Sequence, residues 1–265
     1  MSTESQNSCR CLSVIIPVYN EDATLEGVVR EVLELPHLLE LIIVDDCSSD
    51  RTATVAQKLA AEHVQVRYAR HNENAGKTAA VKTGLSSTRG EIVVIQDADW
   101  EYHPSEIPEL IQPILEGYAD VVYGSRFLVR KATRVLYFYH YLANKALTFC
   151  SNLLTNLNLT DVETGYKAFR GEIVRNMIID SSGFGFEIEV TAKIAKLGCA
   201  VYEVPISYYG RTYAEGKKIG LVDALLAFWL VIRFNLFCGV GASFTEVPKV
   251  PTRSQRRAVG ILKQS

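Results

Sequence analysis

Two carboxylates separated by a single residue are the side chains in this sequence best suited to chemistry. Asp97 and Asp99 follow the apolar run 91–95, which predicts a buried strand, so they lie where that strand ends. Carboxylate oxygens are preferred ligands of Mg²⁺ and Mn²⁺, and such an ion is often shared with a substrate diphosphate. Two unpaired carboxylates this close repel each other, which favours a bound cation over an ordinary acidic turn. Glu101 stands two residues further on and is a candidate third oxygen ligand.

Two more polar segments follow predicted strands. Residues 17–21 read Pro-Val-Tyr-Asn-Glu, and residues 45–50 read Asp-Asp-Cys-Ser-Ser-Asp. Each segment alone is compatible with a turn, because Asp, Asn and Ser favour turns. Open parallel sheets, however, bind ligands beyond the carboxyl ends of their strands. Three such segments in succession therefore predict one binding edge rather than three unrelated turns.

A segment close to a nucleotide-binding loop lies at residues 71–78. The pattern GxxxxGK[ST] requires glycine at its first position so that backbone amides can surround a phosphate, and here that position is His71. The sequence therefore argues against a nucleoside-triphosphate hydrolase. Gly76 and Lys77, at the start of the following helix, are still able to favour a nearby anion.

The apolar pattern predicts the scaffold that positions these segments. Short apolar runs alternate with amphipathic stretches of helical spacing. This alternation predicts βαβ units and an α/β fold with a mostly parallel central sheet flanked by helices. Strands are expected over residues 12–17, 41–44, 64–70, 91–95, 120–123, 166–170 and 199–207, and helices over residues 22–34, 50–63, 75–87, 104–116, 134–155, 186–196 and 221–244.

Composition limits the class of protein. The chain has 265 residues, 48% of them hydrophobic and 22% charged, which fits one large globular domain. The net charge of −2 argues against non-specific nucleic-acid binding as the main activity. The six cysteines form no CxxC pair and are expected to be free thiols in a reducing compartment. The polar N-terminus has no apolar segment typical of a secretory signal.

The C-terminal part predicts contact with a membrane surface. Residues 221–244 are the most apolar stretch, but Asp223 and Arg233 interrupt it, so an interface-lying or core helix fits better than a span. Residues 248–265 hold five basic and no acidic residues, which predicts a flexible tail. This tail is either attracted to an anionic membrane or simply a solvated end. We therefore expect a catalytic domain over 1–220, an amphipathic helix over 221–245 and a basic tail over 246–265.

The motifs resemble those of the family 2 glycosyltransferases, which have the GT-A fold. The resemblance rests on residues 17–21, 45–52, 74–77 and 97–99, and the whole match spans roughly residues 12–235. Later motifs are similar to the branch of dolichyl-phosphate mannose and glucose synthases, at residues 124–126, 164–167, 184–189, 203–206 and 211–217.

The resemblance implies roles at matching positions. Asp97 and Asp99, with Glu101 where relatives often have glutamine, would hold Mg²⁺ or Mn²⁺ on the sugar diphosphate, and Arg211 and Lys217 would close over it. Asp46 would accept a hydrogen bond from the nucleotide base. The nucleotide-sugar pocket would be lined by Pro17, Tyr19, Glu21, Asp46, Lys77 and Asp97. The acceptor phosphate would face Ser125, Arg126 and, less directly, Arg134.

The sequence therefore predicts a metal-dependent, inverting glycosyltransferase that uses a UDP- or GDP-linked sugar and a polyprenyl-phosphate acceptor. It would act as a peripheral protein at the cytoplasmic face of a membrane and would not bind nucleic acid. The alternative is a soluble family 2 enzyme with a hydroxyl acceptor, which requires a base such as Asp161 or Glu187. A non-catalytic nucleotide-sugar sensor is a third possibility, but the intact Asp97 and Asp99 pair argues against it.

Overall fold

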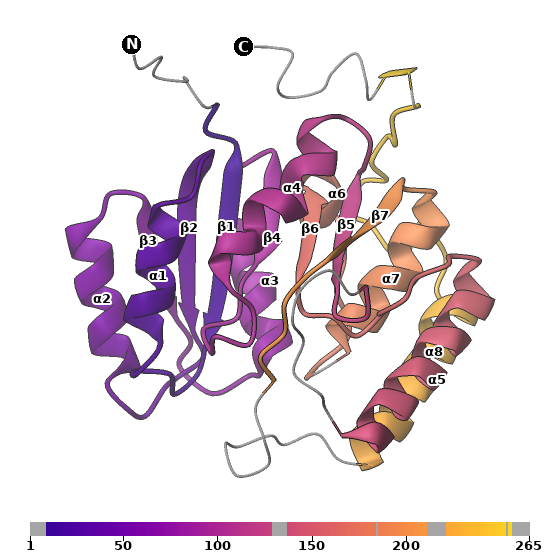
Figure 1. Ribbon diagram of the computed structural model, residues 1–265, viewed down its shortest axis with the longest axis horizontal. Coiled ribbons are helices and arrows are strands. Elements are labelled where there is room, and N and C mark those ends of the chain that lie inside the picture. The colour runs from indigo at the N-terminus through magenta and orange to yellow at the C-terminus, as the bar shows by residue number, and fades with distance from the viewer. Residues whose placement is uncertain (1–8, 129–136, 184, 211–220, 253, 256–265) are drawn as a thin grey trace.

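The frame of the molecule is a seven-stranded sheet (Figure 1). The computed structural model describes residues 9–128, 137–183, 185–210, 221–252 and 254–255. The strand order is β3-β2-β1-β4-β6-β5-β7, and all pairings are parallel except those of β6 with β4 and β5. This confirms the predicted, mostly parallel sheet. The strands are β1 (Leu12–Val18), β2 (Leu38–Asp45), β3 (Val66–Arg70), β4 (Ile92–Ile95), β5 (Val121–Ser125), β6 (Lys167–Arg170) and β7 (Val201–Pro205).

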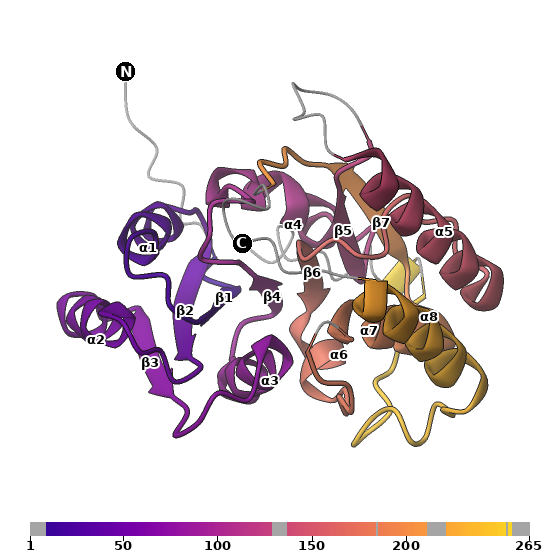
Figure 2. The same ribbon diagram turned by 90° about the horizontal axis from the view of Figure 1, so that it is seen from below.

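Helices cover both faces of the sheet, which explains why its strands are almost continuously apolar (Figure 2). One face packs against α1, α2 and α4, and the other against α3, α6 and α7. The helices are α1 (Leu25–Leu33), α2 (Thr52–Glu62), α3 (Lys77–Ser87), α4 (Ile107–Leu115), α5 (Phe138–Thr155), α6 (Gly171–Arg175), α7 (Phe186–Leu197) and α8 (Leu221–Leu236), with a short 3-10 turn η1 (Pro104–Glu106) before α4.

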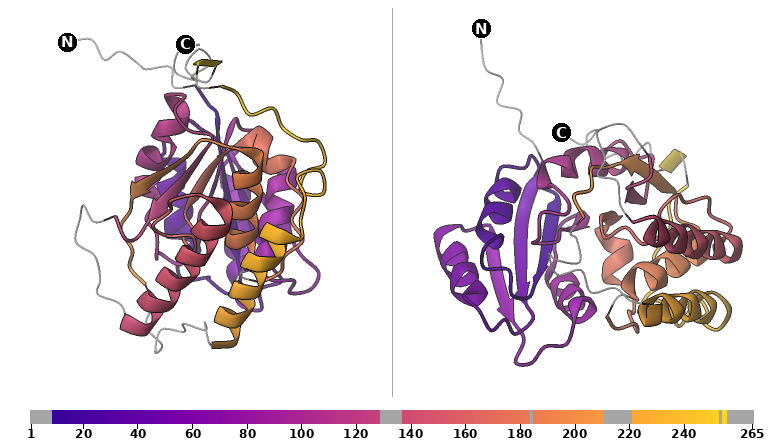
Figure 3. Two further views of the ribbon diagram at one scale, coloured as in Figure 1. Left: turned by 90° about the vertical axis from the view of Figure 1, so that its right-hand side faces the viewer. Right: turned by 60° about the horizontal axis from the view of Figure 1, so that its bottom comes forward.

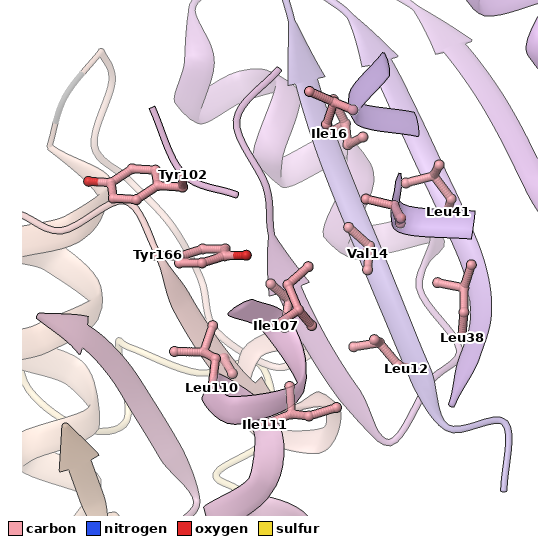
Figure 4. Packing of buried hydrophobic residues seen from close by; sticks show 14 of the residues in the cluster. Leu12, Val14, Ile16, Leu38, Leu41, Tyr102, Ile107, Leu110, Ile111 and Tyr166 are labelled. Atoms are coloured by element: carbon pink, nitrogen blue, oxygen red, sulfur yellow. The ribbon is translucent and has the colours of Figure 1, made fainter. Parts of the chain in front are cut away.

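The central strand β1 shows this two-sided burial most clearly. All seven of its residues are buried. Val14 and Ile16 point into the core beneath α1 and α4, where they lie near Ile107 of α4 (Figure 4). Ile15 points to the opposite face, into the core beneath α3 and α7. The strand therefore holds the two helical layers together.

The reversed strand β6 decides which loop reaches the binding edge. Val94 pairs with Ala168 and Ile92 pairs with Arg170, so β6 begins where β4 ends. Because β6 is antiparallel, the segment that precedes it lies at the edge that the carboxyl ends of the parallel strands share. Residues 161–166 are thereby brought to the loop of Asp97 and Asp99.

Two predicted helices differ from expectation for local reasons. The helix expected over 104–116 is divided into η1 and α4, because Pro108 has no N–H to donate to the carbonyl of Pro104. The helix expected over 221–244 ends at Leu236, shortly before Gly239 and Gly241, which are poor helix formers. The start of the helix expected over 134–155 lies partly outside the described residues, and α5 begins at Phe138.

Helices α5 and α8 lie side by side at one end of the molecule (Figures 1 and 3). Leu147 of α5 and Leu230 and Phe234 of α8 share a core cluster with Ile188 of α7. The segment predicted as a C-terminal amphipathic helix is thus packed on the catalytic layers along one side.

Gly84 provides a test of the packing between α3 and β1. A Cβ at this position would lie 2.4 Å from Cγ2 of Ile15. Alanine normally stabilises a helix interior by about 1 kcal/mol relative to glycine. Here we expect Gly84→Ala to lower the free energy of unfolding by about 1–3 kcal/mol, the cost of overpacking a core. Urea denaturation measures the free energy of unfolding, and Lys82→Ala, an exposed position on the same helix, is the control. A Gly84→Ala protein as stable as the parent protein would contradict this packing.

Candidate active site

The first wall of the site consists of the loops after β1 and β2, which hydrogen bonds join. Asn20 Oδ1 accepts from Ser49 N at 2.8 Å, and Asn20 N donates to Ser48 Oγ at 3.0 Å. Glu21 N donates to Thr52 Oγ1 at 2.9 Å. Asn20 has a φ of 56°, a left-handed conformation that asparagine tolerates. The two polar segments identified in the sequence therefore form a single surface.

The three residues of this wall that were predicted to line the nucleotide pocket differ in how far their side chains are exposed to solvent. Tyr19 is exposed at the rim. Glu21 is half-buried, and its Oε2 accepts from the hydroxyl of Thr24 at 3.0 Å. Pro17 is buried within β1 beside Val44 of β2. Of the three, Tyr19 is the side chain placed to meet a ligand from solvent, and Pro17 shapes the strand end beneath it.

The carboxylate of Asp46 organises the neighbouring loop between β3 and α3. It is only 3% exposed, and it accepts from His71 Nδ1 at 2.7 Å, Ala75 N at 3.0 Å and Gly76 N at 2.7 Å. His71 Nε2 in turn lies 2.9 Å from Thr83 Oγ1. About four acceptor positions exist on a carboxylate, and the protein itself uses three of them. His71, which stands where a P-loop would have glycine, thus helps to hold the Asp46 carboxylate. The clearest role of Asp46 is to fix the loop between β3 and α3.

That loop delivers Lys77 to Asp97. The Lys77 ammonium lies 2.7 Å from Asp97 Oδ1 and 2.9 Å from Oδ2. Burial alone would lower the pKa of Lys77, but Asp97 and the nearby Glu187 outweigh it and raise this pKa above its ordinary value. Asp97 is therefore not an unpaired carboxylate, as the sequence suggested. A Cβ at Gly165 would lie 3.1 Å from Asp97 Oδ2 and 3.6 Å from Lys77 Nζ, so this glycine lets the β6 loop approach the pair.

The other two carboxylates of the acidic loop make different contacts. Asp99 Oδ1 accepts from the backbone N–H of Glu101 at 3.0 Å. The Glu101 side chain accepts from the hydroxyl of Tyr208 at 3.0 Å. Within the described part of the chain, no three His, Cys, Asp or Glu side chains are grouped so that they could hold a metal ion. The protein thus presents no closed metal cage here.

The predicted acceptor residues form a buried network at the end of β5. Arg126 makes a two-pronged ion pair with Asp161, with Nε–Oδ2 and Nη2–Oδ1 both at 2.7 Å. Asp161 is fully buried, so a role as base would require this pair to break. Ser125 is also buried, and its Oγ lies 2.6 Å from Thr160 Oγ1. Three further predicted residues, Arg134, Arg211 and Lys217, lie outside the described residues.

Lys145 is a cation at this network that sequence reasoning missed. Its ammonium donates to the carbonyl of Thr160 at 3.0 Å and lies 4.1 Å from the ring centroid of Phe127. No carboxylate neutralises it among the ion pairs of the described residues, in contrast to Arg126. The available signal was that Lys145 is the one charged residue in the sequence of α5.

An acid–lysine cluster, formed by Glu163, Lys167 and Glu187, lies behind the Lys77–Asp97 pair. Lys167 is fully buried and donates to the carbonyls of Val162 and Thr164. Burial lowers the pKa of Lys167 to about 8. Burial, reinforced by Glu187, raises the pKa of Glu163 to about 7. The sequence singled out Glu187 and the motif that contains Lys167, but not Glu163, which reads as an ordinary loop residue.

Together these residues suit a ligand that carries a diphosphate. Lys77 supplies a fixed positive charge at a helix start, and Asp97 and Asp99 supply hard oxygen ligands for a divalent cation. Both lie at the carboxyl edge of the sheet, beside the wall that Tyr19 borders.

Comparison with known proteins agrees with this geometry. The model of Glycosyl transferase family 2 matches residues 13–177. Undecaprenyl-phosphate mannosyltransferase of Micrococcus luteus is 31% identical over 223 residues, which cover 78% of this chain and 86% of that protein. Polyprenol monophosphomannose synthase of Mycolicibacterium smegmatis is 31% identical over 214 residues, with 78% and 80% covered.

A solved structure is similar as well. The crystal structure of glucosyl-3-phosphoglycerate synthase from Mycobacterium tuberculosis, in complex with Mn²⁺, UDP-glucose and phosphoglyceric acid, superposes with a TM-score of 0.65 at 25% identity. The superposition covers 89% of this chain and 82% of that one. The sheet and its helical layers therefore recur in a structure that held a nucleotide sugar.

Asp46→Asn tests whether Asp46 acts through the loop. An amide nitrogen cannot accept from Ala75 N or Gly76 N, so one buried donor loses its partner. We expect the free energy of unfolding to fall by about 1–3 kcal/mol and the affinity for UDP or GDP to fall about tenfold or more. Urea denaturation and calorimetric titration measure the two effects, with the exposed Glu73→Gln in the same loop as control. Weaker nucleotide binding at unchanged stability would show instead that Asp46 contacts the base directly.

Proposed function

This chain belongs to glycosyl transferase family 2, and we propose that it transfers a sugar from a nucleoside-diphosphate sugar to a polyprenyl phosphate. The chain is a glycosyltransferase with the GT-A fold. The observation that carries the acceptor class is the identity of 31%, over most of both chains, to two proteins whose names specify polyprenyl-phosphate mannose transfer.

The donor half of the proposal is supported by the charges at the carboxyl edge of the sheet. Lys77 is half-buried beside Asp97, and its raised pKa keeps it protonated, so it can bind a diphosphate oxygen when the donor enters. We expect the nucleoside, uridine or guanosine, to lie against the adjoining wall, where Tyr19 is exposed. The predicted cations Arg211 and Lys217 would add positive charge over the same diphosphate.

A divalent cation fits the same place. Asp97 and Asp99 supply two hard oxygen ligands, and the diphosphate can supply others. Asp97 already holds a cationic partner, the Lys77 ammonium, which shows that its carboxylate is placed for positive charge. When bound, Mg²⁺ or Mn²⁺ would neutralise the charge that grows on the leaving diphosphate. The M. tuberculosis synthase was crystallised with Mn²⁺.

The transfer step needs little proton chemistry from the protein. An oxygen of the acceptor phosphate attacks the anomeric carbon, the bond to the diphosphate oxygen breaks, and the configuration inverts. A phosphate monoester is largely ionised near neutral pH, so it needs no base. A hydroxyl acceptor does need one, and Asp161 is engaged by Arg126. Of the two candidate bases, Asp161 and Glu187, this ion pair removes Asp161, which supports the phosphate acceptor.

The acceptor phosphate would approach from the side of β5 and α5. Arg126 is neutralised by Asp161, whereas Lys145 is a half-buried cation that lies over the ring of Phe127. Lys145 is thus the described residue best placed to attract a phosphate to this side. Ser125 would act through Thr160 rather than by direct contact, because it is buried.

The paired helices α5 and α8 supply a surface for the membrane. Along the described parts of the chain, no helix combines the length and apolar character that crossing a bilayer requires. The sequence of α5 contains no carboxylate and that of α8 contains one, Asp223 near its start, whereas Lys145 and Arg233 are basic. We propose that this pair lies on the anionic cytoplasmic face of a membrane, with the basic C-terminal tail as an additional attraction. The exposed large hydrophobic side chains are Phe138, Tyr139, Tyr141, Leu142, Phe149, Leu153 and Leu154 on α5, and Leu225, Leu226, Trp229, Ile232 and Leu236 on α8.

Metal dependence tests the donor site. Asp97→Asn and Asp99→Asn should each lower turnover at least about a hundredfold, because each removes a negatively charged ligand from the cation. Excess EDTA should abolish the activity of the parent protein, and Mn²⁺ or Mg²⁺ should restore it. Circular dichroism and the melting temperature check that the variants are folded. Full turnover in excess chelator would rule out the metal role.

The membrane surface is tested by point substitutions. Removing residues 221–265 would also delete Leu230 and Phe234 and expose the core residues Leu147 and Ile188, so truncation is a poor test. Phe149→Ser combined with Trp229→Ser changes side chains that are 67% and 53% exposed. We expect affinity for vesicles of phosphatidylcholine and phosphatidylglycerol to fall about tenfold or more, at unchanged nucleotide affinity.

Co-sedimentation at low and high salt measures this binding, since the electrostatic part weakens at high salt. The matched control is Val64→Ser, an apolar side chain that is 99% exposed away from α5 and α8. A parent protein that does not sediment with anionic vesicles would refute the surface assignment while leaving the donor site untouched.

A further inference from the structure

Glu163 contains a buried carboxylate oxygen for which the described part of the chain supplies no hydrogen-bond donor. Its Oε1 is shielded from solvent and unpartnered. The contrast with Glu189 is informative: that fully buried carboxylate accepts from the amides of Asp180 and Ser181 and from the ammonium of Lys193. An unpaired buried acceptor destabilises a fold, so it needs a compensating reason. A ligand that donates a hydrogen bond to Glu163 supplies one.

The position of Glu163 indicates which ligand. Two residues further along, Gly165 packs against Asp97 and Lys77, where the diphosphate is proposed to bind. Glu187 acts electrostatically on both Lys77 and Glu163, so it connects the two places. In a nucleotide sugar, the sugar is attached to the second phosphate. Its ring must therefore lie next to the diphosphate site, and Glu163 and Glu187 are also close to that site.

The segment around Glu163 is held rigidly. The Lys167 ammonium donates to the carbonyls of Val162 and Thr164, the residues on either side of Glu163. No carboxylate lies within ion-pair distance of Lys167 in the described structure, so the lysine fixes the backbone without forming an ion pair with Glu163. A fixed backbone and a free carboxylate oxygen are the features of a preorganised hydrogen-bond acceptor.

We propose that Glu163 accepts a hydrogen bond from a hydroxyl group of the donor sugar and thereby selects the sugar. This inference rests on the proposed function. The cluster disfavours the acceptor phosphate, because its two carboxylates outnumber the single Lys167 ammonium, whereas the hydroxyl groups of a neutral sugar can donate to those carboxylates. In addition, the described residues offer no group of three ligands for a metal ion. A buried polar group that a substrate hydroxyl satisfies discriminates strongly against analogues that lack the hydroxyl.

Monodeoxy donors test the inference. The donor is UDP-glucose or GDP-mannose, whichever the parent protein turns over with polyprenyl phosphate, together with its 2-, 3-, 4- and 6-deoxy forms. One deoxy form should lower kcat/KM of the parent protein by about tenfold or more, the effect of a lost hydrogen bond to a charged group. In Glu163→Leu the same deoxy form should lower kcat/KM less than about threefold, because the partner is already gone. Glu163→Gln, which retains an acceptor oxygen, should fall between the two.

Stability and a control variant separate selection from a structural role. Glu163→Leu and Glu163→Gln remove an unpaired buried charge, so their melting temperatures should equal or exceed that of the parent protein. Glu172→Gln, an exposed residue at the start of α6, should change neither the melting temperature nor the preference among donors. Lower melting temperatures with equal losses on every donor would overturn the inference.

Calorimetry distinguishes a failure of this inference from a failure of the proposed function. Glu163→Leu should weaken binding of the nucleotide sugar about tenfold and leave binding of UDP or GDP unchanged. A protein that shows this difference but transfers no sugar to polyprenyl phosphate contradicts the acceptor assignment alone. Binding of the nucleotide sugar that is unchanged in Glu163→Leu contradicts the role of Glu163, whatever the acceptor.

Discussion

The ion pair between Lys77 and Asp97 is the interaction on which the site depends. It joins the start of α3 to the loop after β4, two segments 20 residues apart in the sequence. Lys77 reaches Asp97 because the buried Asp46 carboxylate holds the preceding loop by two amides and by His71. These contacts fix the charges at the edge of the sheet before a ligand binds, and charges fixed in advance stabilise a ligand or transition state without a cost of reorganisation.

The antiparallel strand β6 is the second constraint, and it explains how two halves of the chain form one site. Three loops of the site follow the carboxyl ends of β1, β2 and β4, which belong to the parallel part of the sheet. A loop that enters β6 arrives at the same edge although it precedes its strand. Gly165 then packs against Asp97, and Glu163 is buried two residues earlier. A parallel strand at this place would have carried the same residues to the opposite edge.

Burial divides the charged residues into two groups. Asp161 and Arg126 neutralise each other, as do Glu189 and Lys193, and these pairs hold loops and helices in place. Lys145 and Glu163 are half-buried without such a partner in the described structure, and each lies where a charged or hydroxylated part of a substrate would pass. The exposed apolar surface of α5 and α8 is interpreted in the same way, because large exposed apolar patches mark sites that bind a membrane or another protein.

The sequence alone determined the α/β class, the parallel strands and the acidic pair at the end of β4, because hydrophobic periodicity and turn chemistry are local properties of the chain. It also predicted the family from motifs that retain their spacing. It did not predict that Lys77 pairs with Asp97, that Asp46 binds its own loop, or that Arg126 is neutralised by Asp161. Lys77 and Asp97 are 20 residues apart, Asp46 is 29 and 30 residues from its two amide partners, and Arg126 and Asp161 are 35 residues apart. Only the order of the strands in the sheet brings them together. Glu163 is the clearest case: its residue type is ordinary for a loop, and the antiparallel entry into β6 makes its Oε1 a buried acceptor beside the proposed diphosphate site.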